Sequence, residues 1–173
     1  DDIAVITAEE VDPAFDPRRW AKGKRYRYRL SNRRSRSPMR RNSHWEIFQP
    51  LNLAAMQESV LPLIGKHDFS GFRAADCQAA HAVREITKLE LAGNVGDEIT
   101  FVVEGTAFLK HMVRNIMGSV VEVGRGKQPP SFLGTVLEGK DRTRAGQTAP
   151  PQGLTLEAVF YGNGPREDPD DDD

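Results

Sequence analysis

The segment Arg25–Leu30 alternates strictly between arginine and apolar or aromatic residues. Successive side chains of a β-strand point to opposite faces, so this alternation predicts a strand, extending over Lys22–Ser31, with two unlike faces. The strand places Arg25, Arg27 and Arg29 on one face, and Tyr26, Tyr28 and Leu30 on the other. One face is therefore basic, and the other carries aromatic rings and an aliphatic side chain.

The strand lies within a basic run, Arg18–Arg41, that no acidic residue interrupts. Guanidinium groups match the geometry of phosphate, and aromatic rings stack on unpaired bases. This composition favours binding of a nucleic-acid backbone beside an exposed base. The alternative is a solvated arginine face over a tyrosine-lined core, because long charged faces are common on antiparallel strands. The strand by itself leaves both interpretations open.

Composition limits the class of protein. The 173 residues, 38% of them hydrophobic, suffice for one compact domain or two very small ones. The single cysteine, Cys77, excludes an internal disulfide and a cysteine-rich zinc site, and it suits the reducing cytoplasm. The four histidines are scattered singly, without the spacing of metal ligands. No apolar run approaches the length of a membrane span, so we expect a cytoplasmic protein with no membrane partner.

The two ends of the chain differ from its body. Six of the 25 acidic residues lie between Glu167 and Asp173, so the body is mildly basic and residues 163–173 are expected to form a disordered acidic tail. The chain begins without Met and enters a strand-like run, Ile3–Ala8, almost at once. That beginning is typical of a chain cut within a larger protein, with residues 1–162 as one domain.

The apolar pattern predicts an α+β fold with helices packed on one face of a mostly antiparallel sheet. The expected strands are Ile3–Ala8, Lys22–Ser31, His44–Gln49, Val83–Ala92, Glu98–Glu104 and Leu154–Phe160. The expected helices are a first one capped by Asn52, with a bend at Pro62 and an end at Gly65, then Ala107–Val123 and Ser131–Glu138. Segments Asn32–Ser43, Asp68–Cys77 and Gly139–Gln152 are expected to be loops.

The predicted helix Ala107–Val123 has a polar face with a possible function. At about 100° per residue, Lys110, His111, Arg114 and Gly118 fall opposite the apolar stripe. An arginine held there, beside a glycine that leaves room for close approach, can pair with a carboxylate or hold a phosphate. The alternative is an ordinary solvent-facing helix surface.

The segment Asp141–Leu154 is rich in small and hydroxyl-bearing residues just before a predicted strand. This suits a loop that is ordered at a site, although turn chemistry alone explains it equally well. The chain has no phosphate-binding glycine loop, no Ser/His/Asp order and no zinc spacing. The residues thus indicate an RNA-binding surface without a convincing nucleophile.

Four segments, in this order, resemble one known family: Ala21–Tyr28, His67–Arg73, Ala107–Ile116 with Gly118, and Lys140–Thr143 followed by Ala149-Pro150 and Gly153-Leu154. Together they are similar to the C-terminal part of the bacterial tRNA pseudouridine synthases of the TruA family. The resemblance covers nearly everything from Asp2 to Tyr161. The acidic tail has no counterpart in it.

The resemblance implies a fold and a reaction. Members of this family are α+β homodimers whose central sheet consists of two related halves, and this chain would supply one half of that pseudouridine synthase fold. They need no cofactor and convert uridines 38, 39 and 40 in the tRNA anticodon arm to pseudouridine. An aspartate attacks the nucleotide, the glycosidic bond breaks, and the uracil rotates and rejoins through its carbon 5.

The resemblance also implies residue roles. Tyr26 corresponds to a tyrosine that packs on the target base, Arg114 to the arginine that pairs with the catalytic aspartate, and Leu154 to part of the wall of the base pocket. The tRNA-binding candidates are basic residues of the strand, of the segment before it and of the helix: Arg18, Lys22, Lys24, Arg25, Arg27, Arg29, Lys110 and His111.

One departure is large. The family's nucleophile lies in a Gly-Arg-Thr-Asp-x-Gly-Val-His motif, which this chain lacks, so no aspartate here is nominated. A smaller one lies in Phe15–Ala21, where Arg18 matches but neighbouring residues differ. We therefore expect the natural protein to be a tRNA pseudouridine synthase, and this chain alone to bind tRNA without turnover. The alternative is a non-catalytic RNA-binding or dimerisation module.

Overall fold

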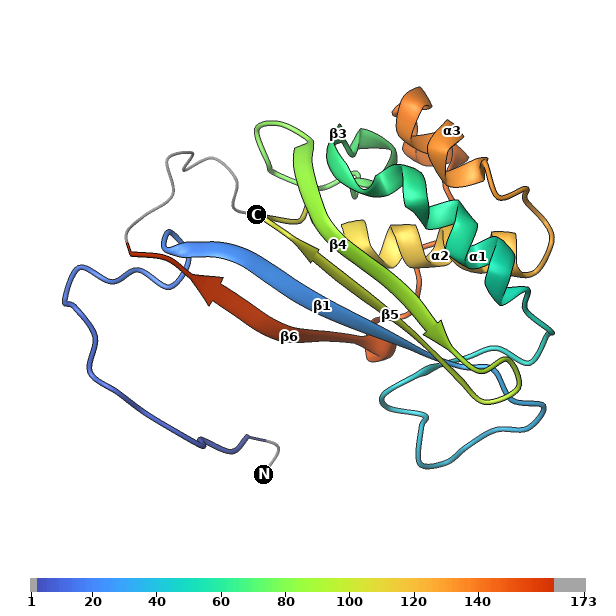
Figure 1. The fold of residues 1–173 in the computed structure, drawn as a ribbon, viewed down its shortest axis with the longest axis horizontal. Coiled ribbons are helices and arrows are strands. Elements are labelled where there is room, and N and C mark those ends of the chain that lie inside the picture. Colours follow the sequence, from blue (N-terminus) through green and yellow to red (C-terminus); the bar gives the residue numbers. More distant parts are fainter. Residues whose placement is uncertain (1–2, 164–173) are drawn as a thin grey trace.

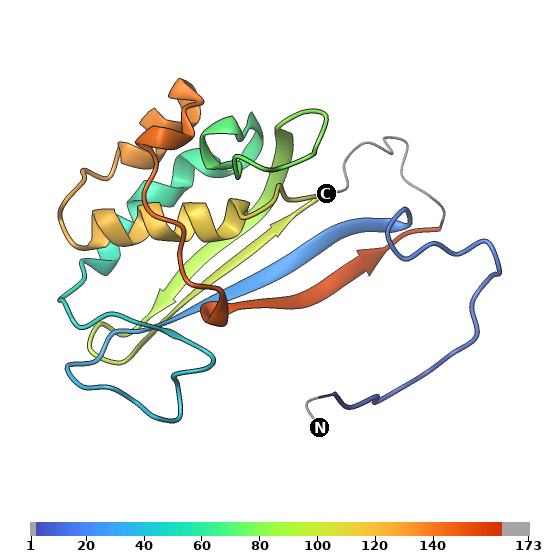
Figure 2. The same ribbon diagram turned by 180° about the vertical axis from the view of Figure 1, so that it is seen from behind.

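The computed structural model describes residues 3–163, which form a six-stranded sheet with three α-helices on one of its sides (Figures 1 and 2). The strands are β1 (Ala21–Ser31), β2 (Trp45–Glu46), β3 (Gly65–Asp68), β4 (Val83–Gly93), β5 (Glu98–Gly105) and β6 (Leu154–Tyr161). The helices are α1 (Leu53–Val60), α2 (Met112–Gly124) and α3 (Phe132–Gly139). This is the predicted α+β architecture, with the helices gathered on one face.

Strand β1 is the long central strand of the sheet. The strands follow the order β2-β1-β5-β4-β3, and β6 also pairs with β1. Strand β5 lies antiparallel along one edge of β1, while β6 and then β2 share the other edge. Only the short β1–β2 pairing is parallel, which confirms the expectation of a mostly antiparallel sheet.

The two unlike faces predicted for β1 are confirmed. Tyr28 and Leu30 are fully buried in the core beneath the helices, and Tyr26 packs partly buried at the edge of that core. The arginines on the opposite face remain partly exposed. Burial of the aromatic face is favourable because it removes a large apolar area from water.

Helix α2 begins later than predicted. Its first residue is Met112. Residues 107–109 are irregular, and Lys110 and His111 form a turn. His111 adopts a left-handed backbone conformation with φ of 60°, which cannot continue a right-handed helix. Lys110 and His111 consequently lie on the turn before α2 and not along its polar face.

Strand Ile3–Ala8 was predicted wrongly, because these residues form no strand and Ile3, Val5 and Ile6 are exposed. An apolar run becomes a strand only where a partner edge is available, and no other described strand pairs with it. Strand β2 is also shorter than the predicted His44–Gln49.

Helix α1 is capped as predicted, since the Asn52 side chain accepts a hydrogen bond of 3.1 Å from the Ala55 amide. It ends at Val60, and Pro62 lies in a 3₁₀ turn, Leu61–Leu63. Strand β3 then begins at Gly65, whose φ of 107° favours glycine. This strand was missed because its sequence is polar and it forms by pairing with β4.

The predicted tail falls, except for Asn163, outside the residues that the structure describes. Among the helices of residues 3–163, none combines the length and the apolar composition needed to cross a bilayer.

Candidate functional site

A cavity of about 600 Å³ opens where strand β1, the beginning of helix α2 and the start of strand β6 meet. Five of the residues nominated from the sequence line it, namely Tyr26, Lys110, His111, Arg114 and Leu154. They come from three segments that are distant in the chain, and the sheet and helix α2 bring them to one place. This cavity is therefore the candidate site.

One wall of the cavity is aromatic and aliphatic. Tyr26 extends from β1, and its ring meets the ring of Phe108 nearly at right angles, with centroids 5.2 Å apart. Burial raises the pKa of the Tyr26 phenol, so the hydroxyl stays protonated at neutral pH. Leu154, on the neighbouring strand β6, adds an aliphatic surface. A wall of this kind suits a flat, uncharged base.

Arg114 supplies the positive charge of the cavity. It lies in the first turn of α2, is half-buried, and donates a hydrogen bond of 2.6 Å from Nε to the carbonyl of Ala149. Its two Nη atoms make no hydrogen bond or ion pair with any residue of the described chain. Because a carbonyl does not neutralise the guanidinium, the free Nη pair can receive a carboxylate or phosphate oxygen.

Lys110 and His111 lie at the same cavity, on the turn before α2. Lys110 forms an ion pair of 2.7 Å between Nζ and Oδ2 of Asp76, which lowers the pKa of that carboxyl. The pKa of His111 lies below its ordinary value, first because of burial and then because of the charge of Arg114. His111 is therefore mostly neutral at pH 7, and Arg114 and Lys110 carry the positive charge.

The segment before β6 is ordered against the cavity, as the composition of Asp141–Leu154 suggested. The Ala149 amide donates to the carbonyl of Arg114 over 3.1 Å, while its carbonyl accepts from the Arg114 side chain. The Tyr28 hydroxyl donates a bond of 2.6 Å to the carbonyl of Pro150. The sequence placed Tyr28 on the aromatic face of β1, either to stack on a base or to line the core, so its role in holding this loop is an addition.

Gly118 leaves room for close approach, but the loop occupies that room. A Cβ atom at Gly118 would lie 1.7 Å from the carbonyl oxygen of Gln147, so any larger residue would displace the loop. At the next residue, the Ser119 hydroxyl accepts a hydrogen bond of 2.9 Å from the Gly146 amide. This side of α2 is therefore buried under the loop, and the alternative of a solvent-facing helix surface is wrong at Gly118.

The arginines of β1 lie away from the cavity, on the face of the sheet that no described helix covers. Arg25 Nε donates to Oε1 of Glu104 on β5 over 2.9 Å, and Arg27 forms an ion pair with Glu157 on β6. The side chain of Arg29 has no hydrogen-bond or ion-pair partner among residues 3–163. Two of the three positive charges are thus compensated by acidic residues of neighbouring strands. This arrangement is close to the alternative interpretation of the sequence, a solvated arginine face over a tyrosine-lined core.

The remaining candidates, Arg18, Lys22 and Lys24, lie at the beginning of β1 or just before it and do not line the cavity. Arg18 is exposed on a turn, where its amide donates to Oδ1 of Asp16 over 2.8 Å. Phe15 packs edge-on against Trp20 and Tyr161, with centroids 5.4 and 5.2 Å apart, which ties this turn to the end of β6.

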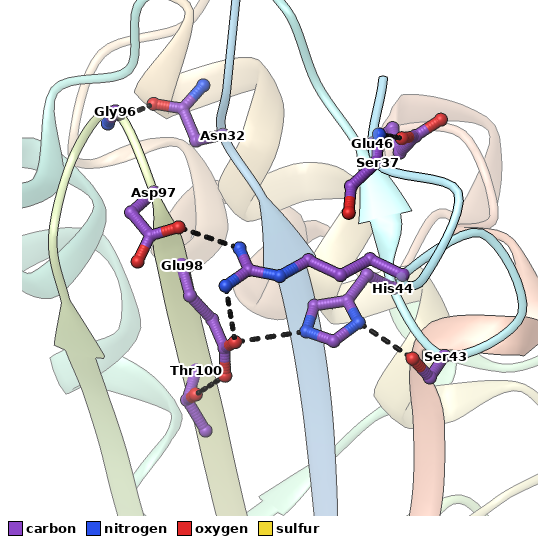
Figure 3. A network of polar contacts seen from close by, with 10 residues as sticks. Asn32, Ser37, Ser43, His44, Glu46, Gly96, Asp97, Glu98 and Thr100 are labelled. Carbon is purple, nitrogen blue, oxygen red and sulfur yellow. Dashed lines mark hydrogen bonds and ion pairs between the residues drawn. The ribbon is translucent and has the colours of Figure 1, made fainter. Parts of the chain in front are cut away.

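At the other end of β1, the basic loop Asn32–Ser43 is tied to the β4–β5 turn by a polar network (Figure 3). Arg40 contacts Asp97 over 2.8 Å and Glu98 over 3.7 Å. Nε2 of the buried His44 lies 3.1 Å from Oε2 of Glu98. Asp97 and Glu98 are thus already paired with Arg40 and His44. The other arginines of the loop are exposed to solvent, namely Arg33, Arg34, Arg36 and Arg41.

Seven lining residues were not nominated from the sequence, and they include Asp76 and Phe108. Asp76 lies in a loop without periodicity, which Arg73 orders by donating to the carbonyls of Cys77 and Ala79, each over 2.7 Å. Phe108 stands within a segment that carried the family resemblance, so a signal for it was present. Within residues 3–163, no three His, Cys, Asp or Glu side chains are grouped to hold a metal ion.

Comparisons with known proteins show which family this chain is similar to. The family model described as tRNA pseudouridine synthase matches residues 60–162. The tRNA pseudouridine synthase A of Myxococcus xanthus is 63% identical over 164 residues, which cover 95% of this chain and 62% of the relative. Those of Geotalea daltonii and Xanthobacter autotrophicus are each 44% identical, covering 92% of this chain and 65% and 64% of their own lengths. The chain thus spans less than two thirds of these relatives.

Proposed function

The chain belongs to the tRNA pseudouridine synthase family, and we propose that its protein isomerises uridine to pseudouridine in the anticodon arm of tRNA. It acts at the three uridines named above, as a cytoplasmic homodimer and without a cofactor. Residues 1–162 form one domain that supplies part of the catalytic site and of the tRNA surface. The observation that carries the proposal is the meeting of Tyr26, Leu154 and Arg114 in one cavity.

In this proposal the target uracil enters the cavity and lies against Tyr26 and Leu154. The free Nη atoms of Arg114 hold the carboxylate of the nucleophilic aspartate, which comes from outside these 173 residues. A neighbouring positive charge keeps a carboxylate ionised and oriented, so it is ready to attack the nucleotide. The bond from the ribose to uracil N1 breaks, the ribose joins carbon 5 of the rotated uracil, and the bond between the aspartate and the nucleotide breaks again, which frees the carboxylate. The carbon 5 proton is released while N1 becomes protonated.

Residues at the mouth of the cavity and basic residues outside it hold the tRNA backbone in this proposal. Lys110 and His111 at the cavity contact the phosphates beside the target nucleotide. Further phosphate contacts come from the strand face and from the segment before it, that is from Arg18, Lys22, Lys24, Arg25, Arg27 and Arg29. Because Arg25 and Arg27 already face acids, we expect each to contribute less than Arg29.

The test is tritium release from tRNA labelled at carbon 5 of uridine, measured with the complete synthase, its Tyr26→Ala variant and this chain alone. We expect release by the complete synthase, loss of release with retained tRNA binding in Tyr26→Ala, and binding without release by the chain alone. Release by the chain alone would place the nucleophile among residues 1–173. Binding without release by the complete protein would instead favour a non-catalytic RNA-binding module.

A further inference from the structure

Arg142 does not line the cavity, and it joins the loop Gly139–Gln152 to helix α2. Its Nη2 atom donates to Oδ1 of Asn115 over 3.1 Å and to the hydroxyl of Thr148 over 3.0 Å. Its Nη1 atom donates to the carbonyl of Gly146 over 3.1 Å. Burial lowers the pKa of Arg142, yet no carboxylate of the described chain pairs with it. Its contacts are therefore to neutral oxygens, which it holds in a fixed geometry.

Arg142, Asn115 and Thr148 form a hydrogen-bonded cluster, and Asn115 fixes one end of it. Its side chain is almost fully buried, at 1% exposed, and Nδ2 donates to the carbonyl of Phe72 over 2.8 Å. Its Oδ1 accepts from Arg142 and also from the hydroxyl of Thr148, over 2.7 Å. Every polar atom of the amide is thus used. A satisfied buried network of this kind specifies one arrangement of the segments that it joins.

Thr148 connects the cluster to the cavity. The next residue, Ala149, accepts the 2.6 Å hydrogen bond from Nε of Arg114, and its amide donates to the carbonyl of Arg114. Pro150 follows and accepts the hydroxyl of Tyr28. A shift of Thr148 would therefore move the carbonyl that orients the Arg114 guanidinium.

We propose that Arg142 is a positioning residue for the reaction, acting through Thr148 and Ala149 to keep the free Nη atoms of Arg114 directed into the cavity. This inference rests on the proposed function. Direct binding of a tRNA phosphate explains Arg142 less well, because both of its Nη atoms already donate to protein oxygens.

The test compares Arg142→Gln and Arg142→Lys with Arg144→Gln in the complete synthase, by kcat and KM for tRNA. Arg144 is the matched control, since it lies on the same loop, is exposed and makes no side-chain hydrogen bond or ion pair with residues 3–163. We expect both Arg142 variants to lower kcat by about 10- to 100-fold with little change in KM, because misplaced catalytic groups cost rates of this order. Lysine fails because its single nitrogen cannot occupy the positions of both Nη atoms.

A double variant separates positioning from general destabilisation. If Arg142 acts through Arg114, Arg142→Gln should reduce kcat little further in an Arg114→Lys background, measured below the melting temperature of every variant. A full multiplicative loss, an unchanged kcat, or a rise in KM alone would each overturn the inference. Absence of activity in the unaltered synthase would refute the proposed function itself, whereas an unreduced kcat in Arg142→Gln refutes only the positioning role.

Discussion

Arg114 and Arg25 are both held through Nε, but their charges face different surroundings. Arg114 donates to a carbonyl, that of Ala149, and keeps two unused Nη atoms at the cavity. Arg25 donates to the carboxylate of Glu104, and its guanidinium also lies 5.4 Å above the ring of Phe160. The first charge is uncompensated in a concave site, and the second is paired on an open face of the sheet.

The difference shows that a regular pattern of basic residues is a weaker guide to a site than one arginine with a neutral partner. The alternation in β1 identified both faces of the strand. It gave no information on Glu104 and Glu157, which reach the arginines only through the pairing of β5 and β6 with β1. An acidic residue on a neighbouring strand compensates the positive charge that the pattern in β1 predicts to be available for binding.

The largest effect that separates the two arginines should be on turnover. In the complete synthase, Arg114→Gln should lower kcat by about 100- to 1000-fold, the usual cost of losing one preorganised charged donor. Arg25→Gln should leave kcat close to that of the unaltered protein. Both variants should retain tRNA binding within a few-fold, measured by filter binding. Equal losses of kcat would contradict the comparison, because they would mean that Arg25 on the open face of the sheet also takes part in the reaction.

Much of the fold could be predicted from local patterns. The alternation in β1, the cap at Asn52 and the strand pair β4–β5 depend on neighbouring residues, and each appears near its predicted place. Strand formation in β3 and in the segment Ile3–Ala8 depends instead on whether the edge of another strand is available for pairing. A local sequence pattern does not contain that information. The start of α2 was missed because His111 is left-handed, a conformation that its side chain does not demand.

The site could be predicted only in part. Tyr26, Arg114 and Leu154 followed from the family resemblance, and the cavity brings them together, although their roles stay predictions. The contacts of Asp76 and Arg142 could not be predicted, because they join segments more than 25 residues apart through single hydrogen bonds. Composition suggested that Asp141–Leu154 is ordered, but it did not indicate which helix the loop packs against.

A smaller effect should distinguish the arginines of the open face from one another. The side chain of Arg29 has no hydrogen-bond or ion-pair partner among the described residues, whereas that of Arg27 must give up its ion pair with Glu157 before it can bind a phosphate. Arg29→Gln should therefore reduce the slope of log K for tRNA against log salt concentration by about 0.7 to 0.9, the value for one lost phosphate contact. Arg27→Gln should reduce it less. Unchanged slopes in both variants would mean that this face only meets solvent.

The smallest predicted effect is on the pKa of His111, which burial and, after it, the uncompensated charge of Arg114 lower. The charge of Arg114 disfavours the protonated imidazole and contributes, after burial, to the lowered pKa of His111. Removing that charge in Arg114→Gln should therefore raise the pKa of His111 toward its ordinary value, so the ring becomes protonated at a higher pH than in the unaltered protein. Arg25→Gln, which removes a paired charge outside the cavity, should leave the titration in place. NMR of the imidazole against pH measures both. A His111 pKa that does not respond to Arg114→Gln would mean that counter-charges already neutralise Arg114, and the contrast with Arg25 would fail.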